Sequence, residues 1–597
     1  MYQNSKIIYS TIIIQMKIQF KIILFILFSV FNGTKAFAVG DVNENDALTR
    51  HFLSPVRIVW KSDNSSKYIV NTDKLLEKGN GQADLVGANL CLMTSPDSCN
   101  SSILLDFGKE MHGGLQLVTG IFKEQKPIKV RITFGESVSE AMSTVLGTSA
   151  TNDHAIRDFE ILLPWLGSIE VGNSGFRFVK IELLEKNREL KLKEVRVIAI
   201  HRDLKYQGSF KCNDERLNQI WQTGAYTVQL NMQQYLWDGI KRDRLVWVGD
   251  MHPEVMTILS AFGYNEVVPK TLDLIRDITK LPNWMNGISS YSMWWIIIQY
   301  QWYMNNGNMD YLKQNKDYTY KLLDLLETKI DSVGNEKLDG HRFLDWPTSP
   351  NKEAIHAGLQ SMMLMTFRNG EKIATILNDK EKATAYKKVW QSLKRNVPTP
   401  NGNKSGAALM AICGLADAKA MNDTLLSKNE TEGISSFYGY YVLQARAKAG
   451  DYDGAMNVIR KYWGGMLELG ATTFWEDFDL KWMENAGRID EITPVGKVDV
   501  HSQYGSYCYK GLRNSFCHGW ASGPTAWLSE HVLGIQVLEA GCRKVKIEPH
   551  LGDLEWVEGT YPTPLGVIYV KHTKQIDGSI KSIIKAPKGV KIESVEN

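Results

Sequence analysis

The densest group of reactive side chains in the sequence is WDGIKRDRLVWVGDMHPE, residues Trp237–Glu254. It holds three aspartates, three cationic side chains and two tryptophans. A solvated helix face accounts for the charges and a core element accounts for the tryptophans, but neither accounts for both. Carboxyl groups crowded beside one another and beside tryptophan have raised pKa values. A general acid that works near neutral pH requires this property, so the stretch is a candidate for acid–base chemistry.

This stretch lies between two predicted helices. Apolar residues recur at helical spacing over 213–237, and the capping-type Asn213 marks the start of this helix. Gly239 signals a turn at its end, and Pro253 lies near the start of the next helix. We therefore expect 238–250 to form a loop at one mouth of a helical domain, where functional residues concentrate. A solvated loop with surface ion pairs is the competing interpretation.

Three further segments place an acid or an imidazole beside tryptophan. In GATTFWEDFD, Trp475 and Glu476 follow a small-residue run, an apolar approach that suits a buried general base. The alternative there is a cluster of acids at the positive end of a helix dipole. Asp345 and Trp346 lie in a predicted loop and are candidates for an acid–aromatic sugar contact. His518 precedes a Trp/Gly-rich helix start and is either a sugar contact or a hydrogen-bonded structural residue.

Several classes of function find no support in the sequence. It contains no Gly-x-Ser-x-Gly elbow, no P-loop and no dinucleotide fingerprint. The absence of C-x-x-C and H-E-x-x-H leaves no indication of a metal, and we expect no cofactor. A net charge of +3 over 597 residues, without a Lys/Arg block, argues against a nucleic-acid partner.

The aromatic content favours a carbohydrate ligand. The chain has 17 tryptophans and 24 tyrosines, and the apolar face of a pyranose packs well on such rings. Two separated acids on a tryptophan-rich helical scaffold suit glycoside hydrolysis. In that reaction one carboxylic acid protonates the departing oxygen and one carboxylate activates water, and the two stand about 6.5–9.5 Å apart in an inverting enzyme.

The apolar periodicity divides the mature chain into three parts. Short β-rich runs over 39–205 predict an N-terminal, jelly-roll-like β-sandwich. Roughly a dozen helical segments, joined by Gly/Pro/Asn/Asp connectors over 206–535, predict a helical toroid. The β pattern returns over 536–597 and predicts a small terminal β domain.

The N-terminus has the pattern of a secretory signal. Lys17 and Lys21 precede the apolar run Ile22–Phe31, and a small-residue cleavage site ends at Ala38. We therefore expect 1–38 to be removed and the mature protein to be exported, to the periplasm or beyond the cell. No later stretch is apolar enough to cross a bilayer and no cysteine follows the cleavage site, so no stable membrane anchor is expected.

The seven cysteines are few and odd in number, which excludes a disulfide scaffold. Two local bridges, Cys91–Cys99 and Cys508–Cys517, are compatible with the spacing. Buried free thiols are the equally supported alternative.

Six segments, which follow the family's order along the chain, resemble the α-L-rhamnosidases of glycoside hydrolase family 78. DGIKRDRLVWVGD resembles the family's D-x-x-x-R-E-R-x-x-W-x-G-D, and GATTFWEDFD resembles its G-A-T-T-I-W-E-R-W-D. SFCHGWASGPTAWL resembles its S-x-N-H-Y-A-x-G-x-V-x-x-W-L helix entry. VKIEPHLGDLEWVEGTYPTPLGVIYV resembles its C-terminal sheet, while LLDFGKEMHGGLQL and GFRFVKIE resemble its N-terminal sandwich. The resemblance spans roughly Leu104 to Val570.

The resemblance implies a multidomain protein in which a central all-α (α/α)6 barrel is flanked by N-terminal and C-terminal β-sandwich domains. It implies hydrolysis of terminal α-L-rhamnosides with inversion, and hence a rhamnosylated glycan or glycoside as the partner. Asp243 occupies the general-acid position and Glu476 the general-base position. Asp238 and Asp250 fall where the family holds rhamnose hydroxyls. The resemblance places four more residues in the same pocket: Arg242, Trp247, Trp475 and His518.

The sequence departs from the family at Asp243, where much of the family has glutamate. Aspartate is one methylene shorter, so its proton reaches about 1.5 Å less far. Either the loop sits closer to the substrate or another acid, such as Glu254, serves. Two further functions stay open: a related glycosidase for another deoxysugar or a uronide, and a carbohydrate-binding protein with impaired catalysis. The natural glycan, the linkage preference and the oligomeric state stay open as well.

Overall fold

The computed structural model describes residues 47–86, 89–507 and 509–594. The predicted signal residues 1–38, with the cleavage site at Ala38, lie outside these ranges, and so does Cys508. The described residues from Leu48 onward belong to one compact unit. The six described cysteines are free thiols, five of them buried, so Cys91 and Cys99 form no bridge.

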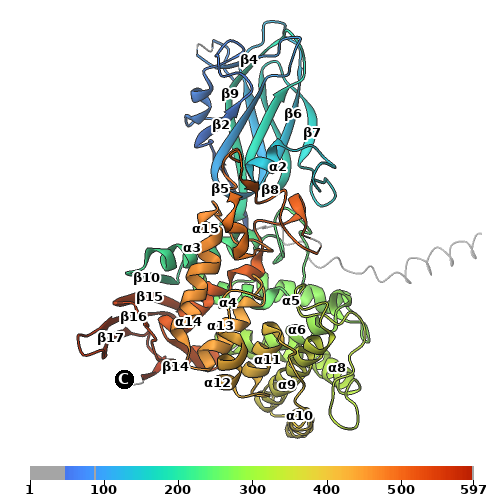
Figure 1. The fold of residues 1–597 in the computed structure, drawn as a ribbon, viewed down its shortest axis with the longest axis vertical. Coiled ribbons are helices and arrows are strands. Elements are labelled where there is room, and N and C mark those ends of the chain that lie inside the picture. The colour runs from blue at the N-terminus through green and yellow to red at the C-terminus, as the bar shows by residue number, and fades with distance from the viewer. Residues whose placement is uncertain (1–46, 87–88, 508, 595–597) are drawn as a thin grey trace, which may run out of the picture. The chain divides into compact units, whose positions relative to one another are not determined.

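Antiparallel strands form the N-terminal β domain (Figure 1). Nine strands share one hydrogen-bonded sheet in the order β3-β4-β9-β5-β8-β6-β7, with β1 on β9 and β2 on β5. Alternating apolar residues of these strands enclose a hydrophobic core separate from that of the remaining chain. The strands are β1 (Leu48–Leu53), β2 (Arg57–Lys61), β3 (Ile69–Val70), β4 (Cys91–Thr94), β5 (Ser102–Thr119), β6 (Ile128–Gly135), β7 (Asp158–Leu163), β8 (Gly167–Leu183) and β9 (Glu189–Arg202).

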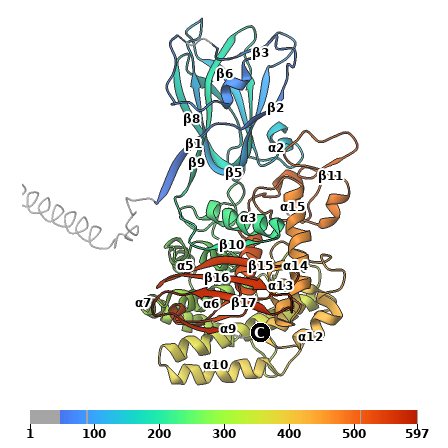
Figure 2. The ribbon, with the colours of Figure 1, turned by 90° about the vertical axis from the view of Figure 1, so that its left-hand side faces the viewer.

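Helices dominate the chain between residues 215 and 527 (Figures 1 and 2). Most are joined by short connectors, and successive helices pack against each other, as α9 does with α10 and α11. The α-helices of this region are α3 (Glu215–Asn231), α4 (Met251–Ala261), α5 (Val267–Ile278), α6 (Ser289–Asn306), α7 (Met309–Gln314), α8 (Lys316–Glu327), α9 (Lys352–Ile376), α10 (Lys380–Leu393), α11 (Lys404–Cys413), α12 (Ala418–Met421), α13 (Gly439–Lys448), α14 (Tyr452–Val458), α15 (Gly464–Glu468) and α16 (Gly523–Trp527). In the described ranges, none of the helices combines the length and apolar character that crossing a bilayer requires.

Side-chain caps explain where many of these helices begin. An Asp or Asn carboxylate or amide oxygen accepts hydrogen bonds from backbone N–H groups of the first turn, which have no partner within the helix. Such caps are Asp214 for α3, Asn351 for α9, Asp379 for α10, Asn403 for α11 and Asp451 for α14.

The first helix differs from its prediction at both ends. Asp214 caps it, whereas the amide oxygen of Asn213 accepts a hydrogen bond from Glu555 N. The helix also ends at Asn231 rather than at residue 237, because the chain reverses into a short antiparallel bridge between Met232 and Leu236. The loop that precedes α4 is therefore longer than predicted.

Helix α6 is largely buried within the helical region. Its sequence is apolar on all sides, with three tryptophans and three isoleucines, and most of its residues are buried. A helix that is hydrophobic all round belongs in a core. The surrounding core continues without interruption into the C-terminal strands, where it includes Val557, Ile568 and Val570.

Two small sheets consist mainly of strands that follow the helices in the sequence. The antiparallel sheet β10-β15-β16-β17 includes Ser209–Cys212, which the prediction grouped with the helical residues 206–535. Figure 2 shows this strand beside β15. A second sheet has the order β13-β14-β18. The strands are β10 (Ser209–Cys212), β13 (Ile535–Glu539), β14 (Lys544–Ile547), β15 (Trp556–Thr563), β16 (Gly566–Lys574), β17 (Ile580–Lys585) and β18 (Lys591–Ser594).

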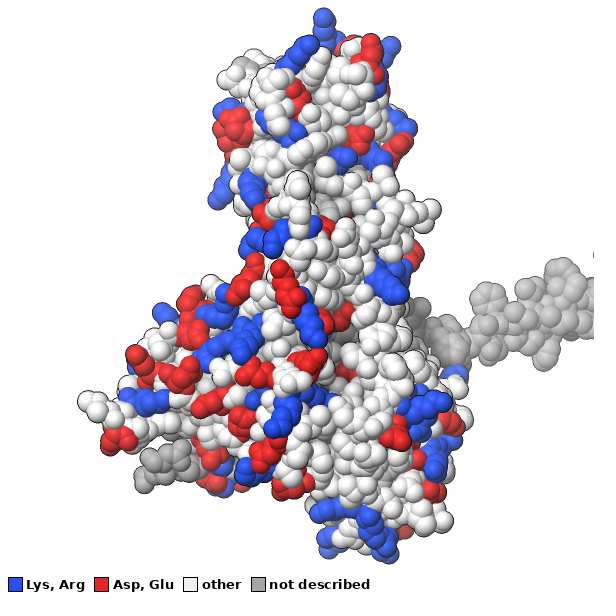
Figure 3. All heavy atoms as spheres, viewed as in Figure 1, with Lys and Arg blue, Asp and Glu red and all other residues white. Residues whose placement is uncertain are grey.

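Charges of both signs are interspersed on the surface. Over the face in Figure 3, Lys/Arg and Asp/Glu alternate, and the described residues there form no extended patch of one sign. Many are paired, as Lys571 is with Glu558 at 3.2 Å and Arg460 with Asp553 at 2.7 Å. Surface pairs of this kind contribute little to stability.

Replacing Gly224 of α3 by alanine is expected to destabilise the protein. The new Cβ would meet Thr525 Oγ1 at 2.2 Å and Ser522 O at 3.0 Å, where α3 packs on α16. Overpacking costs about 1–3 kcal/mol, more than the roughly 1 kcal/mol that alanine gains over glycine in a helix. Urea unfolding measures the loss. Gly464→Ala is the control, since its Cβ would meet only flexible Arg216 side-chain atoms, from 3.2 Å. Equal stability of the two variants would contradict this packing.

Candidate active site

A cavity of about 260 Å³ is lined by residues of the helical region. Its wall includes the loop before α4, the start of α6 and the segment before α16. It brings together eight of the ten predicted site residues: Asp238, Arg242, Asp243, Trp247, Asp250, Trp346, Glu476 and His518.

The loop before α4 turns sharply at its acid. Asp243 and Arg244 both have φ of +56°, a left-handed conformation that residues other than glycine seldom adopt. Two contacts close the turn: Asp238 N donates to Leu245 O at 3.0 Å, and Leu245 N donates to Asp238 Oδ1 at 3.0 Å. Asp238 thus both faces the cavity and holds the loop together.

A single guanidinium bridges the two predicted catalytic carboxyl groups. Arg242 Nη1 donates to Asp243 Oδ1 at 3.3 Å, and Arg242 Nη2 donates to Glu476 Oε1. The second oxygen of Glu476 accepts from Ser515 N at 3.2 Å. Burial raises the pKa of Glu476, and the Arg242 charge opposes this rise. The side chain of Asp243 is 18% exposed and that of Glu476 only 2%, so the two acids differ in their access to water.

A second polar group lies on the wall beside them. Tyr291 Oη donates to Asp250 Oδ1 at 3.0 Å, and His518 Nε2 lies 3.4 Å from Asp250 Oδ2. Burial raises the pKa of Asp250 even though both neighbours oppose it. Burial lowers the pKa of His518, so its imidazole is neutral near pH 7. Neither ring nitrogen has a hydrogen-bond partner within the protein, which leaves this buried ring available to a ligand.

Burial also shifts the pKa of Asp238, the third aspartate of the loop. Together with the carboxylates of Asp243 and Asp250, it holds the pKa of Asp238 well above its usual range. A protonated carboxyl group both donates and accepts hydrogen bonds. The cavity therefore offers polar groups of mixed character, as a ligand with several hydroxyls requires.

Aromatic rings form much of the remaining cavity wall. Trp247 Nε1 donates to Asp243 Oδ2 at 3.2 Å, and its ring meets Tyr291 edge-on at 6.2 Å. Trp346 packs on Phe343 at 5.1 Å between ring centroids. Sequence reasoning missed seven cavity residues because no local pattern of residue types marks them: Asn286, Ile288, Tyr291, His341, Phe343, Tyr509 and Trp520.

Two predicted ligand contacts do not reach the cavity. Asp345 lies behind its wall, where it accepts hydrogen bonds from Ser405 Oγ at 3.0 Å and Ser435 Oγ at 2.8 Å. Trp475 is fully buried and stacks on Phe516 at 4.1 Å. Both side chains face the core because their neighbours, Trp346 and Glu476, occupy the cavity side.

The alternative acid, Glu254, does not line the cavity either. It is buried in α4 against Gly519, whose Cβ, if present, would lie 1.6 Å from Glu254 Oε1. Burial and the nearby Asp250 and Asp238 hold the pKa of Glu254 well above its usual range.

Comparison with known proteins identifies two domains. Residues 205–425 match the bacterial alpha-L-rhamnosidase 6 hairpin glycosidase domain, and residues 534–595 match the bacterial alpha-L-rhamnosidase C-terminal domain. Two segments of the chain are thus similar to domains of the bacterial α-L-rhamnosidases. The first match includes the acid-bearing loop before α4, whereas Glu476 and His518 lie beyond it. Among curated proteins none matches.

Solved rhamnosidase structures share this fold. The GH78 rhamnosidase of Bacillus sp. GL1 is 21% identical, with a TM-score of 0.70 over 86% of this chain and 55% of that one. The α-L-rhamnosidase of Dictyoglumus thermophilum is 17% identical, with a TM-score of 0.69 over 92% of this chain and 59% of that one. A Klebsiella oxytoca rhamnosidase with rhamnose bound is 20% identical, with a TM-score of 0.64 over 81% and 96%. The chain thus spans little more than half of the first two proteins.

A second group of acids lies beneath the loop of this rhamnosidase-like domain. Glu136, Glu140 and His501 offer ligand atoms within 4.8 Å of one another, as a metal site does. However, Lys241 Nζ lies 2.9 Å from Glu136 Oε2 and 3.3 Å from Glu140 Oε1. His501 already contacts Ser137 Oγ and the carbonyl of Asn514 through its two nitrogens. The ammonium group therefore supplies the positive charge that a metal ion would supply.

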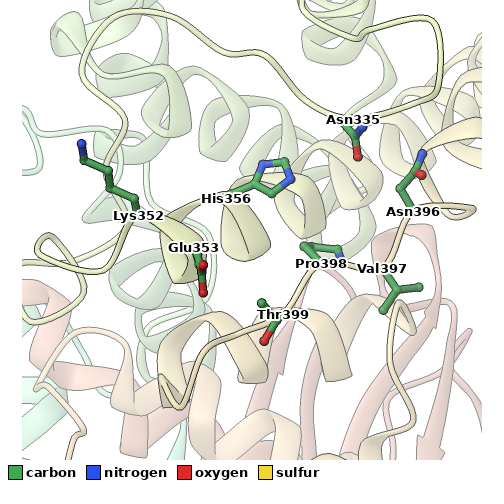
Figure 4. Close-up of a pocket in the computed structure, with 8 residues that line it drawn as sticks. All are labelled: Asn335, Lys352, Glu353, His356, Asn396, Val397, Pro398 and Thr399. Atoms are coloured by element: carbon green, nitrogen blue, oxygen red, sulfur yellow. The ribbon is translucent and has the colours of Figure 1, made fainter.

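Figure 4 shows a larger cavity, of about 460 Å³, at the start of α9. Its lining includes Glu353, Lys352 and His356, together with the loop 396–399. His356 Nδ1 lies 2.5 Å from the buried Glu336. Glu353 is the single carboxylate among its lining residues and has no second acid opposite it, so this cavity lacks the pair that glycoside hydrolysis requires.

Replacing Lys241 by methionine is expected to destabilise the protein by about 3–5 kcal/mol at neutral pH. The substitution leaves Glu136 buried without its cation and leaves Glu140 with only Arg157, at 3.9 Å. Burial already raises the pKa of Glu136 to about 7, and the loss of Lys241 raises it further. The deficit should therefore shrink as the pH falls, because protons neutralise the carboxylates. Urea unfolding at pH 5 and pH 8 measures the effect, with the exposed Lys321→Met as control. A deficit that is the same at both pH values would contradict this account.

Proposed function

We propose that the protein is an inverting α-L-rhamnosidase that removes terminal α-L-rhamnose from a glycan or glycoside. The observation that carries the proposal is the Arg242 guanidinium, which holds Asp243 and Glu476 in an aromatic cavity. The domains that match this chain are those of bacterial α-L-rhamnosidases, and relatives with the same fold include one with rhamnose bound.

The roles of the two acids follow from their surroundings. Asp243 is the more exposed and is the proton donor to the glycosidic oxygen, which leaves toward solvent. Glu476 is buried beside Arg242, whose charge favours its carboxylate form, and is the base for a water molecule. As the bond from C1 to the leaving oxygen breaks, water bonds to C1 from the opposite face and loses its proton to Glu476. The product is the β anomer.

The shorter acid is compatible with this role. Asp243 lines the cavity and contacts the same guanidinium as Glu476, which supports the view that its shorter side chain reaches the substrate. The deep burial of Glu254 outside the cavity disfavours it as the donor.

The remaining cavity groups bind the sugar. Asp238, Asp250 and His518 exchange hydrogen bonds with its hydroxyls, while Trp247 and Trp346 pack on its apolar faces. Four carboxyl groups face one guanidinium in this cavity, which disfavours the negative charge of a uronide. Retention of both catalytic carboxyl groups disfavours a protein that only binds carbohydrate.

We also propose a domain architecture for the protein and its export from the cytoplasm. The helices between 206 and 535 close into an (α/α)6 barrel, with β-sandwich domains at 39–205 and 536–597. The matched 6 hairpin domain supports this arrangement. Cleavage near Ala38 releases the mature enzyme from the cytoplasm, as the basic and apolar residues before it indicate.

Asp243→Asn and Glu476→Gln are expected to lower the hydrolysis of an aryl α-L-rhamnoside by about 10²–10⁴-fold, the usual contribution of a general acid or base. Steady-state kinetics of the purified variants measure the loss. The control is Glu353→Gln, which alters the cavity of Figure 4 and should leave the rate unchanged. A wild-type protein that binds rhamnose without cleaving any rhamnoside would overturn the proposal. Near-full activity of either variant would overturn the role of that residue.

Arg242→Gln is expected to change the pH dependence of the reaction. The Arg242 charge lowers the pKa of Glu476, so its removal raises that pKa. Because the base must be ionised, the acidic limb of the kcat/KM profile should move to higher pH, by about 1–3 pH units. Arg244→Gln is the control, since Arg244 contacts Asn173 rather than a cavity carboxylate. If the acidic limb of the kcat/KM profile does not move in Arg242→Gln, then Arg242 does not control the ionisation of Glu476.

A further inference from the structure

A loop of the N-terminal β domain reaches the proposed general acid. The segment 143–157 leaves the helix α2 (Val138–Met142) and leads into β7. Within it, His154 Nδ1 lies 3.4 Å from Asp243 Oδ1, and the histidine side chain is 26% exposed. The acid therefore has a neighbour from outside the helical region, on a segment that the sequence did not connect with the site.

The proton of this histidine can be assigned from its other contacts. Arg513 Nη2 lies 3.2 Å from His154 Nε2, and a guanidinium can only donate. Nε2 is therefore the acceptor and Nδ1 carries the proton that faces Asp243. Asp153 Oδ2 lies 3.4 Å from the same Nε2 but binds Arg513 Nη1 at 2.7 Å, so its charge is already paired. Asp153, Arg513 and Asp243 are thus the charged groups that face this imidazole.

The loop is held in place by several contacts. Arg157 Nη2 donates to Ser143 Oγ at 2.6 Å and closes the loop at its base. Asn152 Oδ1 accepts from Arg157 N at 3.0 Å. At the tip, Leu512 N donates to Thr148 O at 3.3 Å, beside the Arg513 contacts. His154 is consequently presented from a fixed backbone.

We infer that His154 is a positioning residue for the general acid and that the N-terminal β domain thereby completes the active site. This inference rests on the proposed function. Arg242 donates to Oδ1 of Asp243 at 3.3 Å, and the protonated Nδ1 of His154 lies 3.4 Å from the same oxygen. Oδ2 has a single neighbouring donor, Trp247 Nε1 at 3.2 Å, and is therefore the less occupied oxygen and the one that we assign to the acidic proton. A donor from the adjoining domain thus orients a carboxyl group whose short side chain reaches less far than glutamate.

The dependence on the leaving group tests this inference. Protonation of the leaving oxygen matters for a poor leaving group, such as methanol, and matters little for an activated one, such as 2,4-dinitrophenolate. His154→Ala should lower kcat for methyl α-L-rhamnoside by about 10–100-fold, the usual cost of a misplaced catalytic group. It should change kcat for the dinitrophenyl rhamnoside less than about threefold, and KM for both substrates little.

Two more variants separate positioning from a structural role. His154→Asn should restore most of the activity on the methyl rhamnoside, because its amide N–H occupies the place of Nδ1–H. His201→Ala, which alters a histidine of the same β domain stacked on His51, should leave both rates unchanged. Thermal unfolding checks that each variant is folded.

The outcomes distinguish the two proposals. Equal losses on both rhamnosides in His154→Ala, or no rescue by His154→Asn, would overturn the positioning role while the rhamnosidase function stands. A wild-type enzyme that hydrolyses neither rhamnoside would overturn the proposed function, and this inference with it. A leaving-group-dependent loss, rescued by asparagine, establishes the role.

Discussion

The buried guanidinium of Arg242 is the interaction on which the candidate site depends. A carboxylate as deeply buried as Glu476 is driven toward its protonated form, and Arg242 opposes that tendency. The same guanidinium reaches the more exposed Asp243, so one cation orients two acids whose surroundings differ. Different surroundings are what give two carboxyl groups different protonation states at one pH.

The loop before α4 owes its position to two successive cations. Arg242 faces the cavity acids, while Lys241 faces Glu136 and Glu140 on the side of the N-terminal β domain. Lys241 also donates to the carbonyls of Leu512 and Asn514, next to the residue that binds Glu476 through its backbone. Buried charges are tolerated only when they are paired. The cavity acids bind Arg242, and the acids of the N-terminal β domain bind Lys241. The two groups of acids therefore fix the loop before α4 between the helical region and the β domain.

The sequence predicted the parts of the site that depend on local pattern. The acids of the loop before α4, and Glu476 after its small-residue run, stood out through residue types and spacing. Asp345 and Trp475 were misplaced because a neighbouring aromatic or acid does not reveal which side chain faces the cavity. Helical periodicity located the helices, but it did not reveal that β10 pairs with β15, since strand pairing is a long-range contact. His154 could not be found, because a lone histidine in another domain carries no local signal.

The stereochemistry of the first product tests the central claim most directly. Proton NMR during the hydrolysis of an aryl α-L-rhamnoside resolves the two anomers of free rhamnose before mutarotation mixes them. If Asp243 and Glu476 act as acid and base on opposite faces of the sugar, β-L-rhamnose forms first and the α anomer appears later. Initial release of the α anomer would require a covalent intermediate and would contradict the roles assigned to both carboxyl groups.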